Sequence, residues 1–232
     1  MRFDLKRIGP CIAAAIVAVC APAGPARAQV YTGNQYAFSA GTITADTADY
    51  TVGLGGKVDV AIYLRESLGA VGNDFLLANE GGLLGAGVLL SWAVQSGTGA
   101  PSAINSVADV LVNPAFNQSA AELITLSPDS LELRVGRDMF QEATGVEPVV
   151  DGDGDTASVL LATLTFSAGA ADVETLVTMT DRSDKDEAVT EQSRVPLDDQ
   201  LTNDGFTLTT PIPEPASLAL LGVGGLLLGR RR

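Results

Sequence analysis

Histidine is absent from the 232-residue chain, and cysteine occurs only twice, at Cys11 and Cys20. Without imidazole there is no Ser-His or Cys-His nucleophile pair, no histidine general base and no histidine metal ligand. Both cysteines lie in a leading segment that we expect to be removed, so the mature chain would hold no disulfide and no thiolate site. Its stability must then come from burial of a core or from bound ions.

Basic residues are scarce, with 14 Lys and Arg against 28 Asp and Glu. Between residues 29 and 211 there are seven basic and 26 acidic residues, a balance of −19. Binding to nucleic acid needs clustered Lys and Arg, so nucleic acid is not an expected partner. Hydrophobic residues make up 46% of the chain, which is enough to bury a core and excludes a wholly disordered protein.

The first 28 residues predict a secretory signal peptide. Three basic residues precede an apolar run at residues 8–21, and the small-residue site Ala26-Arg27-Ala28 follows. We expect the export machinery to cleave after Ala28. The alternative is a retained membrane anchor, for which the apolar run is short compared with the roughly 20 residues of a span.

The other end of the chain, residues 211–232, has three parts in order. A stiff proline-rich stretch comes first, an uncharged apolar stretch follows at residues 216–229, and basic residues close the chain; the charged and proline positions are Pro213, Glu214, Pro215, Arg230, Arg231 and Arg232. As a helix, residues 216–229 would reach about 21 Å, short of a hydrocarbon core of about 30 Å. Local thinning and snorkelling arginines would close that gap, so we expect a short transmembrane helix in the inner membrane.

Taken together, these three parts closely resemble the PEP-CTERM sorting signal of Gram-negative bacteria, which is also catalogued as an ice-binding protein C-terminal domain. The resemblance implies that an exosortase, a membrane-embedded cysteine transpeptidase, processes the tail after export. It also implies a link to exopolysaccharide or biofilm matrix, because many members travel with such genes. Pro213, Glu214 and Pro215 would then be recognised by another enzyme. Regular threonine arrays are too short here for ice binding to be expected of the body.

Residues 29–210 predict one acidic all-β domain. Alternating or β-branched segments predict strands at 58–65, 88–95, 131–135, 160–166, 173–180 and 206–209, with weaker strands at 42–45, 107–112 and 123–126 and one helical turn near 119–123. Gly, Asn, Asp, Ser and Pro separate most of these segments. Many short strands with turn punctuation favour a single antiparallel β-sandwich of jelly-roll type over a parallel α/β sheet.

The order of the strand at 58–64, the strand around Trp92 and the run at 160–166 is similar to cohesin and related carbohydrate-binding-module sandwiches. That resemblance concerns the fold and does not by itself give a function. Aromatic residues are only 5% of the chain, and Trp92 has core parity, so its expected role is packing. Exposed aromatic side chains, the platforms that glycans need, are expected at Tyr31, Tyr36, Tyr50 and Tyr63.

One short motif predicts a metal site. Asp151, Asp153 and Asp155 alternate with glycines, and three carboxylates on a flexible loop can converge on a hard cation such as Ca²⁺. The EF-hand pattern fails, because Thr156 and Ala162 stand where that loop needs Gly and an acidic residue. The alternative is a solvated turn between two strands.

No nucleophile motif of the Gly-x-Ser-x-Gly or Ser-x-x-Lys type is present. Two suitably spaced carboxylates would suffice for a glycosidase, but no motif distinguishes any candidate among Glu66, Glu80, Glu122, Glu132 and Glu142. The mixed-charge run at 181–199 predicts a solvated loop. We therefore expect an exported, non-enzymatic surface or matrix protein. The alternatives are a carbohydrate- or protein-binding module and a secreted hydrolase with a carboxylate pair.

Overall fold

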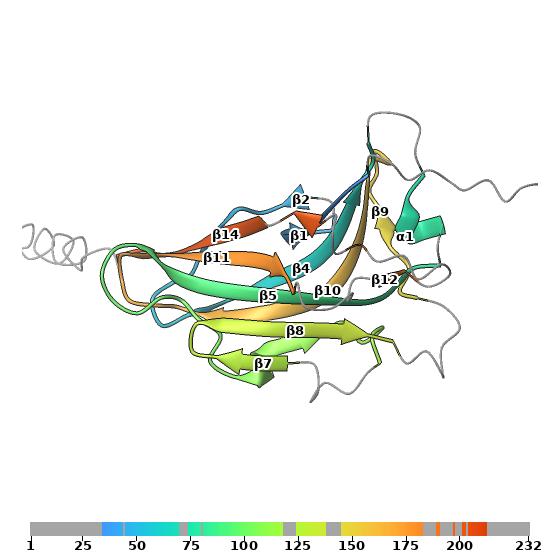
Figure 1. Cartoon of the computed structure of the whole chain (residues 1–232). Helices are drawn as coiled ribbons and strands as arrows, with labels where there is room; N and C mark the ends of the chain where they lie inside the picture. Colours follow the sequence, from blue (N-terminus) through green and yellow to red (C-terminus); the bar gives the residue numbers. More distant parts are fainter. Residues whose placement is uncertain are drawn as a thin grey trace, which may run out of the picture. The chain divides into compact units, whose positions relative to one another are not determined.

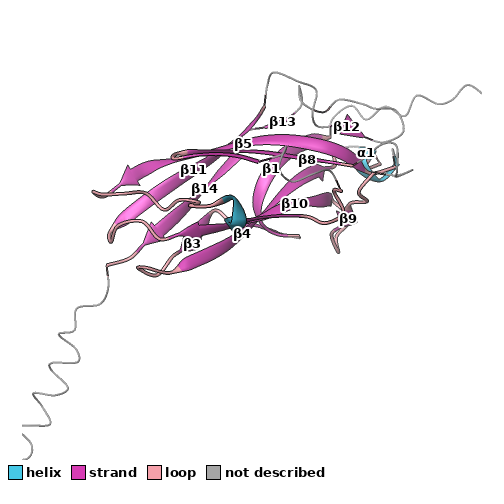
Figure 2. Ribbon diagram, turned by 90° about the horizontal axis from the view of Figure 1, so that it is seen from below, coloured by secondary structure: helices cyan, strands magenta, loops and turns pink. Residues whose placement is uncertain are grey.

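Two β-sheets pack face to face around one hydrophobic core in the computed structural model (Figure 1). The structure describes residues 34–43, 45–69, 74–79, 81–117, 124–137, 145–182, 189–190, 197, 201–202 and 204–212. Within these residues each sheet has seven strands (Figure 2). The predicted all-β sandwich is confirmed.

The first sheet is built around its two longest strands, β4 and β10. In order it contains β13 (Leu201–Thr202), β1 (Gln35–Thr42), β4 (Lys57–Ser67), β10 (Thr156–Ser167) and β6 (Val110–Val112), with β2 (Ala45–Asp46) beside β1 and β9 (Val149–Val150) beside β10. All pairs in this sheet are antiparallel except β1 with β13.

The second sheet is built around β5 and β11. In order it contains β3 (Asp49–Thr51), β14 (Asp204–Thr210), β11 (Val173–Asp181), β5 (Leu83–Ser96), β8 (Ser130–Gly136) and β7 (Ile124–Ser127), with β12 (Val189–Thr190) beside β5. Here β3 and β14 run parallel. The described helical segments are short: α1 (Leu76–Asn79) and the 3₁₀ turn η1 (Val107–Asp109).

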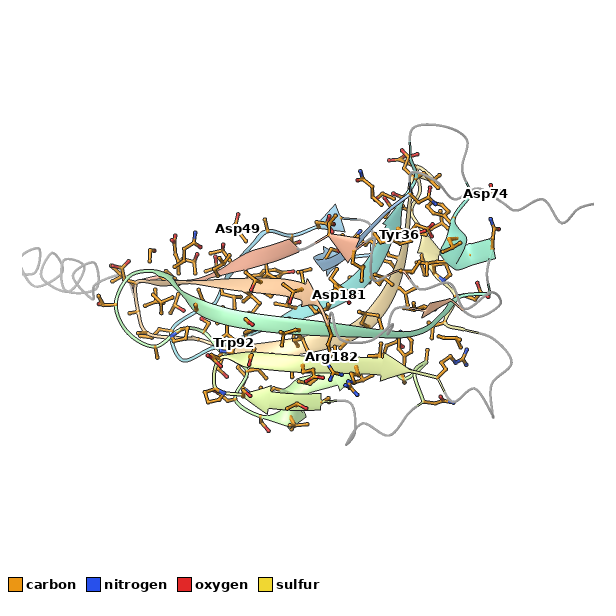
Figure 3. All side chains as sticks on the ribbon, viewed as in Figure 1. Tyr36, Asp49, Asp74, Trp92, Asp181 and Arg182 are labelled. Carbon is orange, nitrogen blue, oxygen red and sulfur yellow. The ribbon has the colours of Figure 1, made fainter. Side chains whose placement is uncertain are left out.

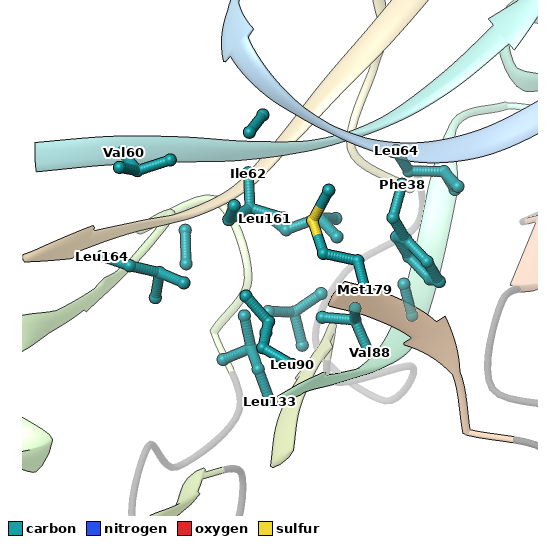
Figure 4. Packing of buried hydrophobic residues seen from close by; sticks show 14 of the residues in the cluster. Phe38, Val60, Ile62, Leu64, Val88, Leu90, Leu133, Leu161, Leu164 and Met179 are labelled. Carbon is teal, nitrogen blue, oxygen red and sulfur yellow. The ribbon is translucent and has the colours of Figure 1, made fainter. Parts of the chain in front are cut away.

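The core forms because alternate residues of each strand point between the sheets. On β4 the side chains of Val60, Ile62 and Leu64 are fully buried (Figure 4). Trp92 of β5 meets Phe166 of β10 edge-to-face with ring centroids 5.9 Å apart, which joins the two sheets. Each such large apolar side chain contributes about 1.5–3 kcal/mol through burial.

The strong strand predictions agree with the structure, and the weaker ones agree in part. The segment 42–45 is divided by a turn at Ile43, and 107–112 begins as η1 before β6. Strand β1 was not predicted, because small residues such as Ala37 and Ala40 weaken its alternation. The helical turn near 119–123 lies outside the described residues.

Candidate functional site at the exit of the carboxyl tail

The sorting segment begins directly after the last strand. Thr210 ends β14 and is fully buried, whereas Pro211 and Ile212 are exposed and are the last described residues. The predicted sorting residues Pro213, Glu214, Pro215, Arg230, Arg231 and Arg232, the predicted helix at 216–229 and the cleavage position Ala28 lie outside the described residues. The chain thus passes from a buried strand residue to the predicted motif through two residues.

Three loops surround Thr210, and we call loops 52–56, 97–106 and 168–172 the exit loops. Asp172 donates its backbone N–H to the Thr210 carbonyl at 2.8 Å. The N–H of Ala170 bonds the Ala100 carbonyl at 2.9 Å, and the N–H of Ala168 bonds the Gly56 carbonyl at 3.0 Å. The exit loops are therefore held to β14 and to one another by the backbone.

Buried hydroxyl groups complete this arrangement. Ser102, Thr175 and Thr210 are each fully buried. The Ser102 N–H donates to Thr175 Oγ1 at 2.8 Å, the Ser102 and Thr210 hydroxyl oxygens lie 3.3 Å apart, and the Gly169 N–H donates to Ser102 Oγ at 3.0 Å. Because buried polar groups are costly when unpaired, this network fixes the loops in one conformation.

Glycine is required where two exit loops touch. Gly97 has φ +87°, and a Cβ there would collide with the Asp172 carbonyl oxygen. Asp172 itself has φ +60°, a conformation that non-glycine residues rarely adopt. The close approach therefore depends on the absence of a side chain at Gly97.

The opposite end of the sandwich contains a buried carboxylate that the sequence did not single out. Glu66 is fully buried at the end of β4 and accepts four hydrogen bonds. The donors are Asn34 Nδ2 at 2.6 Å, the Tyr36 hydroxyl at 2.9 Å and the backbone N–H groups of Leu76 at 2.7 Å and Leu77 at 2.9 Å. Glu66 thereby holds the first turn of α1 and the start of β1 to the sheet.

On the other face of β4, Arg65 is also buried and is paired with acceptors. Its guanidinium donates to the Ser39 hydroxyl and the Thr42 carbonyl and pairs with the Asp46 carboxylate at 2.7 Å. It also lies over the Tyr63 ring at 5.4 Å from the centroid. These contacts fasten the β1–β2 turn over the outer face of the first sheet.

Two tyrosines predicted to be exposed are buried. Tyr36 is 1% exposed because it lies on the core side of β1 and bonds Glu66, and Tyr63 is 8% exposed because Arg65 lies over it. Tyr50 is half-buried, and burial raises the pKa of its hydroxyl. Tyr31 lies outside the described residues. The predicted aromatic platforms are therefore wrong for Tyr36 and Tyr63.

The aspartate loop forms the turn between β9 and β10. Asp151 Oδ1 accepts the N–H of Asp155 at 3.0 Å and that of Thr156 at 3.3 Å. Desolvation raises the pKa of the Asp151 carboxyl, but hydrogen bonds from backbone N–H groups outweigh it and leave that pKa below its usual value. Across the described part of the chain no group of three or more acidic side chains could hold a metal ion, and Asp151, Asp153 and Asp155 do not converge. Calcium binding by this loop stays a prediction.

Two further features bear on catalysis and binding. Glu132 pairs with Arg182 at 2.7 Å and with Arg134 at 3.2 Å.

On the outer face of the second sheet a shallow groove of about 260 Å³ is lined by Ser91, Trp92, Ala93, Asp129, Ser130, Leu176 and Thr178. Trp92 contributes only its edge, because it is 2% exposed and its indole N–H donates to the Pro128 carbonyl at 3.2 Å.

Comparison with known proteins bears on the tail. The family model described as the PEP-CTERM protein-sorting motif matches residues 211–232. No curated protein matches the chain. The chain is similar to a solved structure described as "AvmM Catalyzes Macrocyclization in Alchivemycin A Biosynthesis", with 8% identity, a TM-score of 0.26 and coverage of 77% of this chain and 92% of that one. So low a score supports no conclusion about fold or activity, and the cohesin resemblance stays a prediction.

The predicted sorting signal is thus confirmed by the family match. Among the described residues, none of the helices has the length and apolar character needed to cross a membrane. Residues 211–232 match the PEP-CTERM protein-sorting motif, and this motif implies export and sorting to the cell surface with an exosortase as the processing partner.

Proposed function

We propose that the chain is a non-enzymatic protein of the cell surface or extracellular matrix, held transiently in the inner membrane by residues 216–229 before exosortase processing. The observation that carries this proposal is the sorting motif placed directly after a completed β-sandwich. In this proposal residues 1–28 direct export and are removed after Ala28. The β-sandwich is the part that is delivered, and the tail is the signal that directs its sorting.

Two of the five glutamates considered for a hydrolase are engaged in other contacts. Glu66 has no exposed surface, so it cannot contact a substrate, and Glu132 is paired with two arginines. Glu80, Glu122 and Glu142 lie outside the described residues. This supports a structural or matrix role for the body over a carboxylate-pair hydrolase.

The sorting role is tested by altering the motif in the producing bacterium. We expect Glu214→Ala to leave the full chain unprocessed in the inner-membrane fraction, because the acidic residue of the motif is what the exosortase would recognise. Glu147→Ala, which removes an exposed acidic residue of the body, is the matched control and should be processed normally. Normal processing of both variants would exclude the proposed use of the motif.

The proposed matrix role predicts which genes lie beside the gene for this chain. A gene for an exosortase and a cluster for exopolysaccharide synthesis beside the gene for this chain would support it. The body's surplus of negative charge keeps it soluble once released and favours association with cationic rather than anionic polymers. Absence of any exosortase gene from the genome would contradict the proposal.

The groove on the second sheet supports a second candidate, a carbohydrate- or protein-binding module. Hydroxyls of Ser91, Ser130 and Thr178 and the Asp129 carboxylate lie beside apolar Ala93 and Leu176 there. Such a mixed surface can bond polyols while covering their CH faces. A glycan array with the full chain and with Thr178→Trp, which would fill the groove, tests it; a ligand bound equally by both chains would not occupy this groove.

A further inference from the structure

The two ends of the sandwich differ sharply in charge. Exit loops 52–56 and 97–106 contain no Asp, Glu, Lys or Arg, and loop 168–172 has only Asp172 at its end. Lys57, which borders this end, is paired with Asp109 at 2.7 Å. In a body with a balance of −19, these loops form a nearly neutral surface.

The opposite end is acidic. Its described loops contain Asp74, Glu147, Asp151, Asp153 and Asp155. The register of Gln35 with Ser67, and of Ser67 with Thr156, shows that the first described strand also starts at this end. Tyr36 and Asp74 lie toward it and Trp92 toward the other (Figure 3).

The neutral end also exposes apolar side chains next to the tail. Leu54 is 53% exposed in an exit loop, and Ile212 is 61% exposed where the chain leaves the sheet. Val149 and Val150 are exposed to a similar degree at the acidic end, so exposed apolar side chains alone do not distinguish the two ends. At the exit end they lie next to the tail and beside few charged groups.

Residues 211–215 form the tether between the sandwich and the apolar stretch. The length of this tether limits how far the exit loops can lie from the membrane. Five residues, three of them prolines, separate Thr210 from Ala216, where the apolar stretch begins, so six Cα-to-Cα steps join the two positions. In an extended proline-rich conformation at about 3.1 Å per residue they reach roughly 19 Å. Strand β4 alone has 11 residues, about 36 Å at 3.3 Å each, so the domain is longer than its tether.

We propose that the exit loops are a membrane-apposed surface. While the tail holds the chain, loops 52–56, 97–106 and 168–172, together with Leu54 and Ile212, rest against the lipid headgroups, and the acidic end points away from the bilayer. Anionic headgroups would repel the acidic end within about a Debye length of 8 Å more strongly than the exit end, where Asp172 and Glu174 are exposed. This inference rests on the proposed anchoring by residues 216–229.

Site-directed labelling tests the orientation. The full chain with Cys11→Ala and Cys20→Ala is expressed in a bacterium without an exosortase, and Leu54→Cys or Val149→Cys is added as a single labelling site. The two positions are matched in exposure, at 53% and 51%, and lie at opposite ends. The membrane-held protein is labelled with a fluorophore and reconstituted into vesicles of phosphatidylethanolamine and phosphatidylglycerol that contain a headgroup quencher.

We expect several-fold stronger quenching at position 54 than at position 149. Thr98→Cys, on another exit loop, is a second reporter, so a folding defect of one variant does not decide the result. Equal quenching at both ends of a vesicle-bound chain would overturn the orientation and leave the anchoring intact. A chain that the vesicles do not retain would overturn the anchoring itself. Protection of position 54 only when an exosortase is added would assign the exit loops to that enzyme and overturn the lipid contact.

Discussion

The two ends of this sandwich are closed by different chemistry. At the tail end, backbone hydrogen bonds, three buried hydroxyls and a glycine contact join the exit loops around Thr210. At the far end, the fully buried Glu66 carboxylate accepts hydrogen bonds from four donors on two separate segments. One end is fixed by neutral groups in close contact, and the other by charge-assisted hydrogen bonds.

This difference indicates which end can meet a membrane. A surface held by backbone and hydroxyl groups needs no charged side chains to fix its loops, and the exit loops contain a single one, Asp172. The far end holds its loops with carboxylates such as Glu66 and Asp151.

Removing the Glu66 carboxylate should damage the far end most. We expect Glu66→Ala to lower the free energy of unfolding by about 3–5 kcal/mol, because four buried donors lose their acceptor. Urea unfolding measures the loss. Glu147→Ala removes an exposed acidic residue and should change stability by less than about 0.5 kcal/mol. Similar small effects for both would show that α1 is held by other contacts.

Adding one methyl group should damage the exit end. We expect Gly97→Ala to cost about 2–3 kcal/mol of unfolding free energy, because φ +87° and the collision with the Asp172 carbonyl both oppose a side chain. Gly53→Ala, in a neighbouring exit loop, is the matched control, since a Cβ there meets nothing within 4 Å. If the two variants unfold at the same urea concentration, the loops are not closely packed.

The Asp151 turn should respond to acid at the far end. Because the pKa of Asp151 is lowered on folding, its contribution to stability is present above the ordinary value of 3.8 and is lost as pH falls below it. Asp151→Ala should therefore melt lower than the parent at neutral pH and approach it in acid, whereas Asp153→Ala should follow the parent throughout. Millimolar Ca²⁺ tests the predicted calcium site: a rise in melting temperature that Asp153→Ala abolishes would establish it, and an unchanged melting temperature would exclude it.

Tyr50, which adjoins exit loop 52–56, should give the smallest effect and only in base. Burial raises the pKa of its hydroxyl, so the unfolded chain ionises first and stability falls as pH rises above the ordinary value of 10.0. Tyr50→Phe should flatten this part of the pH–stability curve measured by thermal melts. An unchanged curve would assign the alkaline loss to other groups.

Many strands of the sandwich could be predicted because apolar and polar residues alternate along them. Val60, Ile62 and Leu64 have the parity of one buried face, and Leu131, Leu133 and Val135 repeat the pattern on β8. Glu66 continues the parity of its strand, so an acidic residue at a core position was a usable signal for a buried charge. Its donors could not be inferred, because Asn34 lies 32 residues away and α1 has only four residues.

The grouping of the exit loops around Thr210 could not be predicted because it depends on the topology of the sheet. Glycines in 97–106 and 168–172 predict turns, but only the pairing of β14 with β11 and β3 brings those turns around Thr210. The hydrogen bonds inside the aspartate loop could not be predicted from the sequence either, because Asp151 Oδ1 accepts backbone N–H groups whose positions depend on the folded turn. Alternation of apolar and polar residues predicts which face of a strand is buried. It does not predict which loops contact one another.

Strand β14 is the last part of the body to leave the ribosome, and it lies inside its sheet between β3 and β11. Until it arrives, the places of Phe206 and Leu208 in the core stay empty, and the edges of both neighbours lack partners. The domain therefore cannot finish folding before residue 210 has been made and, during export, has crossed the membrane. The residues that complete the core therefore directly precede the sorting motif in the chain.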